Sequence, residues 1–217
     1  MVEISVSVLN VKNENAIKTF YNIEEAGTNY FHIDVMDGRF VKQENLKQMK
    51  EYATTIKHIS NLPLDVHFMV ENIKDIIDDY IELQPNIMTF HIEASKENTT
   101  NIISYVKEQG IKVGLAISPK TQIKEIEEYL PYIHLVLVMT VEPGLGGQKL
   151  LPETIKKIEE INYYREKNNI DFEIEVDGGI NLETSSLVKN AGADILVAGS
   201  AILQSKDYKQ MIADLKK

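Results

Sequence analysis

Two kinds of hydrophobic pattern alternate along the chain. Short runs of β-branched and aliphatic residues predict buried strands, and longer stretches with apolar positions three or four residues apart predict amphipathic helices. Eight strands are predicted, at Ile4–Leu9, Tyr30–Asp34, Leu64–Met69, Ile87–His91, Lys112–Ile117, Leu135–Thr140, Phe172–Val176 and Ile195–Ala198. Helices are predicted between them, at Asn15–Ala26, Asn72–Leu83, Thr99–Gln109, Ile123–Leu130, Pro152–Asn168 and Leu182–Asn190.

The order of these elements predicts the fold class. Strands that alternate with helices form parallel sheets covered by helices, and eight such units close a (β/α)8 TIM barrel. An open doubly wound sheet is the structural alternative, but it usually has fewer strands and carries a GxGxxG after the first strand, which is absent here. No linker, low-complexity segment or charge block divides the chain, so we expect residues 1–217 to form a single domain.

Polar side chains share one parity on several predicted strands. Neighbouring strand residues point to opposite faces. The polar parity comprises Ser5 and Ser7 on the first strand, His32, Asp34 and Met36 on the second, Asp65, His67 and Met69 on the third, Thr89, His91 and Glu93 on the fourth, and Glu173, Glu175 and Asp177 on the seventh. An antiparallel sheet with one wet face would give the same alternation. The alternating helices favour a polar barrel lumen instead.

Four residues of this polar parity form a candidate metal site. His32, Asp34, His67 and Asp177 lie near the ends of three predicted strands. Buried imidazoles and carboxylates cost several kcal/mol unless they are paired or bind a metal. A lone strand histidine is usually a hydrogen-bonded core residue, but two histidines and two aspartates together suit Zn²⁺, Mn²⁺, Fe²⁺ or Co²⁺.

Weaker candidates for site residues lie on the same face of the predicted strands. Met36, Met69 and Met139 point to the lumen, although core packing is the usual role of methionine. His91 and Glu93 either support the site or pair with each other. Glu175 requires a buried partner, which the sequence does not identify.

Glycine-rich segments follow the last three predicted strands. They comprise Gly144, Leu145, Gly146 and Gly147 after the sixth strand, Gly178 and Gly179 after the seventh, and Gly199 and Ser200 after the eighth. Glycine lets backbone N–H groups approach an anion, and a short helix opening at Ser200 would add its positive end. Barrels often bind phosphate in these loops. Each segment alone is an ordinary turn, but their coincidence predicts a phosphate site.

Composition and charge restrict the partners. The net charge of −10 argues against nucleic acid or an anionic membrane as the main partner, so an anionic substrate would need a local backbone site. The chain has no cysteine, which excludes disulfides and thiolate metal sites and fits a cytoplasmic location. No signal peptide and no run of membrane-spanning length is apparent.

Six segments carry a family resemblance. They are HIDVMDGRFV at 32–41, LDVHFMV at 64–70, FHIEA at 90–94, VMTVEPGLGGQ at 138–148, IEVDGGI at 174–180 and AGADILVAGS at 191–200. In this order they resemble the ribulose-phosphate 3-epimerase family, with matching motifs from Ser7 to Ser200. The combination of HxDxMDG and VDGG is highly specific.

The resemblance implies a barrel of the ribulose-phosphate-binding type that interconverts D-ribulose 5-phosphate and D-xylulose 5-phosphate. It implies that His32, Asp34, His67 and Asp177 bind one divalent ion and that Asp34 and Asp177 form the acid–base pair. Ser7 and His67 would contact the sugar, and the three methionines would line the reacting centre. The glycine-rich segments, with Leu145 and Ser200, would hold the phosphate. We also expect a homo-oligomer in the cytoplasm, serving carbohydrate metabolism.

Several positions depart from the family pattern. The segment Lys42–Met49 lacks the usual Pro-Asn-rich loop and predicts an immediate helix, and Asn10, Lys12, Glu142 and Leu145 replace common residues. These departures leave three alternatives open: a 3-epimerase of a ketohexose 6-phosphate such as D-allulose 6-phosphate, a catalytically inert phosphate-binding barrel, and a phosphate-barrel decarboxylase. The decarboxylase is disfavoured because no Asp-x-Lys-x-x-Asp array is present.

Overall fold

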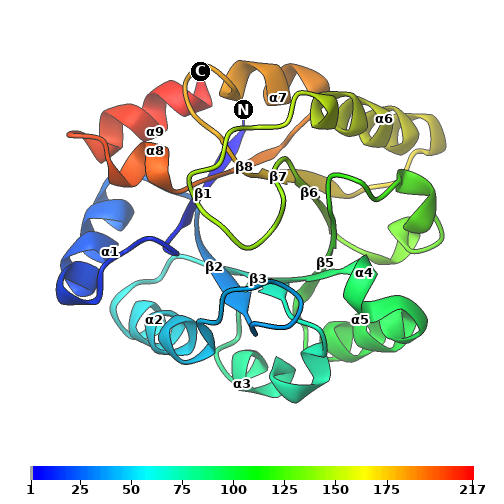
Figure 1. The fold of residues 1–217 in the computed structure, drawn as a ribbon, viewed down its shortest axis with the longest axis horizontal. Coiled ribbons are helices and arrows are strands. Elements are labelled where there is room, and N and C mark those ends of the chain that lie inside the picture. The colour runs from blue at the N-terminus through cyan, green and yellow to red at the C-terminus, as the bar shows by residue number, and fades with distance from the viewer. Residues whose placement is uncertain (1) are drawn as a thin grey trace.

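Eight parallel strands close into a barrel in a computed structural model, which describes residues 2–217. Each strand is hydrogen-bonded to its neighbours in chain order, and helices surround the barrel (Figure 1). The strands are β1 (Glu3–Ser7), β2 (Tyr30–Met36), β3 (Leu64–Met69), β4 (Ile87–His91), β5 (Lys112–Ile117), β6 (Leu135–Met139), β7 (Glu173–Asp177) and β8 (Ile195–Ala198). The predicted (β/α)8 barrel is confirmed.

Helices of unequal length connect the strands. The α-helices are α1 (Ala16–Glu25), α2 (Leu46–Ile59), α3 (Ile77–Ile81), α4 (Ile92–Ser95), α5 (Thr99–Glu108), α6 (Glu153–Asn168), α7 (Ser185–Ala191), α8 (Ser200–Leu203) and α9 (Tyr208–Lys216). Short 3-10 turns lie at Asn13–Asn15, Ile73–Asp75, Lys96–Asn98, Ile123–Glu125 and Leu130–Tyr132. No helix within residues 2–217 combines the length and the apolar character needed to cross a membrane.

Three helix predictions were wrong in part. The segment Ile123–Leu130 forms a 3-10 turn and irregular turns instead of a helix, because it is short and runs into Pro131, which disfavours helical backbone before it. The segment Asn72–Leu83 is divided at Ile76, where φ is −134°. Lys42–Met49 becomes helical only from Leu46.

The parity of the strands is confirmed by the packing. Outward residues such as Ile33 and Val66 are fully buried in the core beneath the helices. The lumen holds a second apolar cluster that includes Leu135, Leu137 and Ile195. Polar residues such as His32, Asp34 and His67 share the lumen face with this cluster. The strand register therefore brings the polar ends of neighbouring strands together.

Candidate metal and phosphate site

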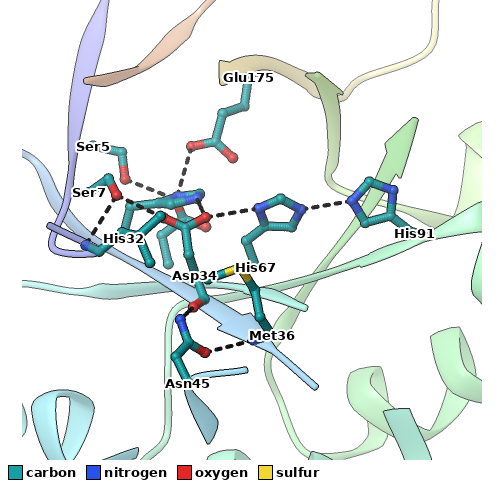
Figure 2. A network of polar contacts seen from close by, with 11 residues as sticks. Ser5, Ser7, His32, Asp34, Met36, Asn45, His67, His91 and Glu175 are labelled. Carbon is teal, nitrogen blue, oxygen red and sulfur yellow. Dashed lines mark hydrogen bonds and ion pairs between the residues drawn. The ribbon is translucent and has the colours of Figure 1, made fainter. Parts of the chain in front are cut away.

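Two imidazoles and two carboxylates meet at the carboxyl ends of β2, β3 and β7. One ligand atom each from His32, Asp34, His67 and Asp177 can be chosen so that all lie within 4.8 Å of one another. The register places Asp34 directly beside His67. Asp34 Oδ1 lies 3.3 Å from His32 Nε2 and 3.3 Å from His67 Nδ1, and both rings point toward it (Figure 2). The structure thus brings together all four predicted ligands.

This donor set fits a divalent ion. Both ring-to-carboxylate separations exceed the usual length of a charge-assisted hydrogen bond, about 2.7–2.9 Å. His32 Nε2 is buried and has no hydrogen-bond partner among the described residues. Imidazole nitrogen and carboxylate oxygen without thiolate suit Zn²⁺, Mn²⁺, Fe²⁺ or Co²⁺.

Asp65 orients the first imidazole. His32 Nδ1 contacts Asp65 Oδ2, which also accepts a 2.8 Å hydrogen bond from Ser5 Oγ. A carboxylate behind one ring nitrogen fixes the tautomer of a metal-binding histidine and directs the other nitrogen to the metal. Asp65 was not predicted as a site residue, although its lumen parity beside His67 was visible in the sequence. Glu175 Oε1 lies 3.9 Å from His32 Nδ1 but is not hydrogen-bonded to it.

Asp34 is held from two directions. Ser7 Oγ donates a 2.7 Å hydrogen bond to Asp34 Oδ2. Asn45 Nδ2 donates to the Asp34 carbonyl at 2.8 Å, and Asn45 Oδ1 accepts from the Met36 N–H at 2.8 Å (Figure 2). These bonds draw Asn45 to the end of β2 and explain why α2 begins only at Leu46.

The two aspartates differ in their pKa. Burial opposes ionisation of Asp34, but the charge of the adjacent His32 holds its pKa far below the usual range. Burial, followed by the charge of Asp34, raises the pKa of Asp177 to about 7. Opposite shifts within one pair keep Asp34 charged near neutral pH and bring the pKa of Asp177 close to neutral pH, so that Asp177 exchanges a proton readily; this suits a base and an acid.

A cavity opens beside the aspartates. It is lined by Ser7, Leu9, Asn10, Asp34, Met69, Met139, Val141, Gly144, Leu145, Gly146, Gly147, Gln148, Asp177, Gly178, Gly179, Ile180, Val197, Gly199 and Ser200. The loop from β6 to α6 crosses the barrel mouth (Figure 1). All the glycine-rich segments predicted for phosphate therefore border one cavity with both aspartates.

A sequence model described as the ribulose-phosphate 3 epimerase family matches residues 3–203. The chain belongs to this family.

Its relatives span distant organisms. Ribulose-phosphate 3-epimerase of Methanocaldococcus jannaschii is 40% identical over 216 residues, covering 100% of this chain and 90% of the relative. The Bacillus subtilis protein of the same name is 36% identical, covering 100% and 99%. The structure of a 3-hexulose-6-phosphate synthase has a TM-score of 0.71 at 14% identity, covering 99% of this chain and 98% of that chain, and supports the fold alone.

Two of the three methionines expected from the epimerase resemblance line the cavity. Met69 and Met139 do so, whereas Met36 is buried against Val41 and Met69 in a small apolar cluster. Asn10 was noted only as a departure from the epimerase pattern, yet it lines the cavity, and a Cβ added at Gly146 would lie 2.4 Å from Asn10 Nδ2. No sequence signal identified Asn45, because its bonds depend on the path of the loop after β2.

Gly179→Ala tests the predicted role of the glycine-rich loops in phosphate binding. Gly179 has φ +66°, and an added Cβ would lie 2.3 Å from the Leu150 backbone nitrogen. The loop must shift, and a cost of about 1–3 kcal/mol to substrate binding corresponds to a KM for sugar phosphate roughly 5–150-fold higher. Gly27→Ala is the matched control: it has φ +83° but nothing within 4 Å. We expect Gly27→Ala to lower stability with KM unchanged; an equal KM for both variants would contradict the phosphate assignment.

Asn45→Ala tests the brace on Asp34. It leaves the Asp34 carbonyl and the Met36 N–H without their partner, which costs about 1–3 kcal/mol of unfolding free energy. We expect a lower urea midpoint and lower turnover. Lys47→Ala, at a side chain 91% exposed in the same helix, should change neither. Equal behaviour of the two variants would show that the brace has no effect.

Proposed function

We propose that the chain is a metal-dependent ribulose-phosphate 3-epimerase, which interconverts D-ribulose 5-phosphate and D-xylulose 5-phosphate. The observation that carries the proposal is the pair of aspartates, Asp34 and Asp177, at one ion-ligand cluster beside a glycine-lined cavity. The names of the relatives agree with it.

His32, Asp34, His67 and Asp177 would hold the ion. A divalent ion there would supply Lewis-acid stabilisation of negative charge on the substrate oxygens. His32, Asp34 and His67 are buried, and a bound cation would compensate the negative charge of the aspartates there. The choice among zinc, manganese, iron and cobalt belongs to this proposal.

The two aspartates would carry the proton transfers. The C3 proton lies beside the C2 ketone, so its removal leaves an enediolate. The charged Asp34 takes the proton from one face, and the protonated Asp177 gives its proton to C3 from the opposite face, which inverts that centre. In the reverse direction the two carboxyls exchange these roles. The Ser7 hydroxyl fixes Asp34 for this step through its 2.7 Å hydrogen bond.

The remaining lining residues would bind and shield the substrate. Backbone N–H groups of Gly144–Gly147, Gly178, Gly179, Gly199 and Ser200 are available to the phosphate. Because α8 has only four residues, its dipole adds little, and the glycine-rich backbone supplies most of the attraction. Met69 and Met139 present apolar surface to the reacting carbon. This local site offsets the net charge of −10.

Turnover of two substrates tests the proposal. We expect a higher kcat/KM for D-ribulose 5-phosphate than for D-allulose 6-phosphate, measured with purified protein and added divalent ion. A preference for the six-carbon sugar would assign the chain to hexose phosphate. No turnover of either sugar, with the ion bound, would support the inert phosphate-binding barrel.

A further inference from the structure

A line of polar side chains continues behind His67, away from the aspartates. His67 Nε2 lies 3.0 Å from His91 Nε2, on the opposite side of the ring from Asp34 (Figure 2). His91 Nδ1 lies 3.0 Å from Glu93 Oε2. Both histidines have no exposed surface, so solvent water does not satisfy these nitrogens. Their hydrogen bonds must be satisfied by one another and by Glu93.

The contact between two ring nitrogens fixes their protonation relative to each other. A hydrogen bond between neutral imidazoles needs one N–H and one lone pair. Glu93 as a carboxylate only accepts, so His91 carries its hydrogen on Nδ1 and presents a lone pair at Nε2. His67 then carries its hydrogen on Nε2. Asp34 Oδ1, 3.3 Å from His67 Nδ1, also only accepts and would compete for a hydrogen on that nitrogen. An ion held by Asp34 would remove this competition and leave the Nδ1 lone pair of His67 for the same ion.

The carboxylate of Glu93 is itself held in place. Its Oε1 accepts a 2.8 Å hydrogen bond from the Ser118 N–H and another from Thr121 Oγ1. Lys157 Nζ on α6 donates to the carbonyls of Ser118 and Pro119 at 2.9 and 2.6 Å, which holds this loop after β5. Oε2 is therefore the oxygen directed at His91.

We propose that His91 and Glu93 form a positioning relay, which fixes the tautomer of His67 so that its Nδ1 lone pair faces the metal site. The relay rests on the proposed metal site. His91 and Glu93 lie behind His67 and do not line the cavity assigned to the substrate. They act through His67, and they tie it to the loop after β5.

Nitrogen-15 NMR of the zinc-bound protein tests the relay without any variant. The chemical shift of an imidazole nitrogen distinguishes a protonated nitrogen from a lone pair. We expect hydrogen on Nε2 of His67 and on Nδ1 of His91. The reverse pattern on either ring would overturn the proposal.

Glu93→Gln tests the relay through metal affinity. The Ser118 N–H requires an acceptor, so the glutamine oxygen takes the Oε1 position and its NH2 group faces His91 Nδ1. This reverses both tautomers and places hydrogen on His67 Nδ1. We expect zinc affinity, measured by titrating metal-free protein, to fall about 10–100-fold.

Thr121→Val is the matched control. It removes one donor to Glu93 Oε1 but keeps the carboxylate facing His91, so zinc affinity should remain close to that of the parent protein. Unchanged affinity in Glu93→Gln, or an equal loss in both variants, would overturn the relay. If both histidines show the expected tautomers but the protein does not epimerise the sugar, the relay stands and the proposed function is contradicted.

Discussion

Asp34→Asn and Asp177→Asn are each expected to lower the turnover of D-ribulose 5-phosphate by about 10³-fold, the middle of the range for general acid–base groups. An amide neither accepts the C3 proton nor returns one. The two carboxyls serve opposite faces of the sugar, so neither replaces the other. Initial rates of D-xylulose 5-phosphate formation measure the effect.

Both aspartates also contribute to the ion cluster, so metal content must be measured for each variant. A variant that retains its ion and still loses turnover isolates the proton transfer. Asp79→Asn, the same change at an exposed position in α3, is the control and should leave turnover unchanged. Near-normal turnover in either site variant would refute the acid–base assignment.

Removal of divalent ions is expected to abolish turnover, and added Zn²⁺, Mn²⁺, Fe²⁺ or Co²⁺ to restore it. Bound ion should also raise the free energy of unfolding, because only the folded barrel assembles all four ligands. Free ion at about 100 times its Kd adds roughly 2.7 kcal/mol, which raises the Tm of a chain of this size by about 5–10 °C. Turnover and thermal unfolding, with and without ion, measure the two effects.

The response to the ion has a predictable pH dependence. Burial opposes protonation of His32, but Asp65 and Asp34 raise its pKa well above the usual value. An ion must displace that proton, so its affinity should fall as pH falls.

His32→Gln provides the control for the stability measurement, since it removes one ligand and should remove most of the Tm increase. No effect of any divalent ion on turnover or Tm would contradict the metal site.

The sequence predicted the barrel well because periodicity reports burial directly. The predicted bounds of β3, β4, β5 and β8 match the structure. Parity then placed His32, Asp34 and His67 in the lumen, since a closed parallel barrel leaves only two faces for each strand. The glycines at the strand ends were likewise visible as a cluster.

The supporting contacts were harder to predict. Asn45 braces β2 through bonds that depend on a loop path, and no periodicity encodes such a path. The contact between His67 and His91 depends on side-chain rotamers across neighbouring strands. The sequence therefore could not decide whether His91 and Glu93 only pair with each other or also support the metal site. The helix prediction for Ile123–Leu130 was wrong although the segment has helical periodicity. A segment this short before Pro131 does not sustain a helix.

Hydrogen exchange at C3 of D-ribulose 5-phosphate in D₂O measures the two-aspartate transfer most directly. Deuterium should appear at C3 of the D-xylulose 5-phosphate formed, and neither exchange nor conversion should survive removal of the ion. Conversion that leaves the original hydrogen on C3, or deuterium uptake that persists when both Asp34 and Asp177 are asparagine, would contradict it.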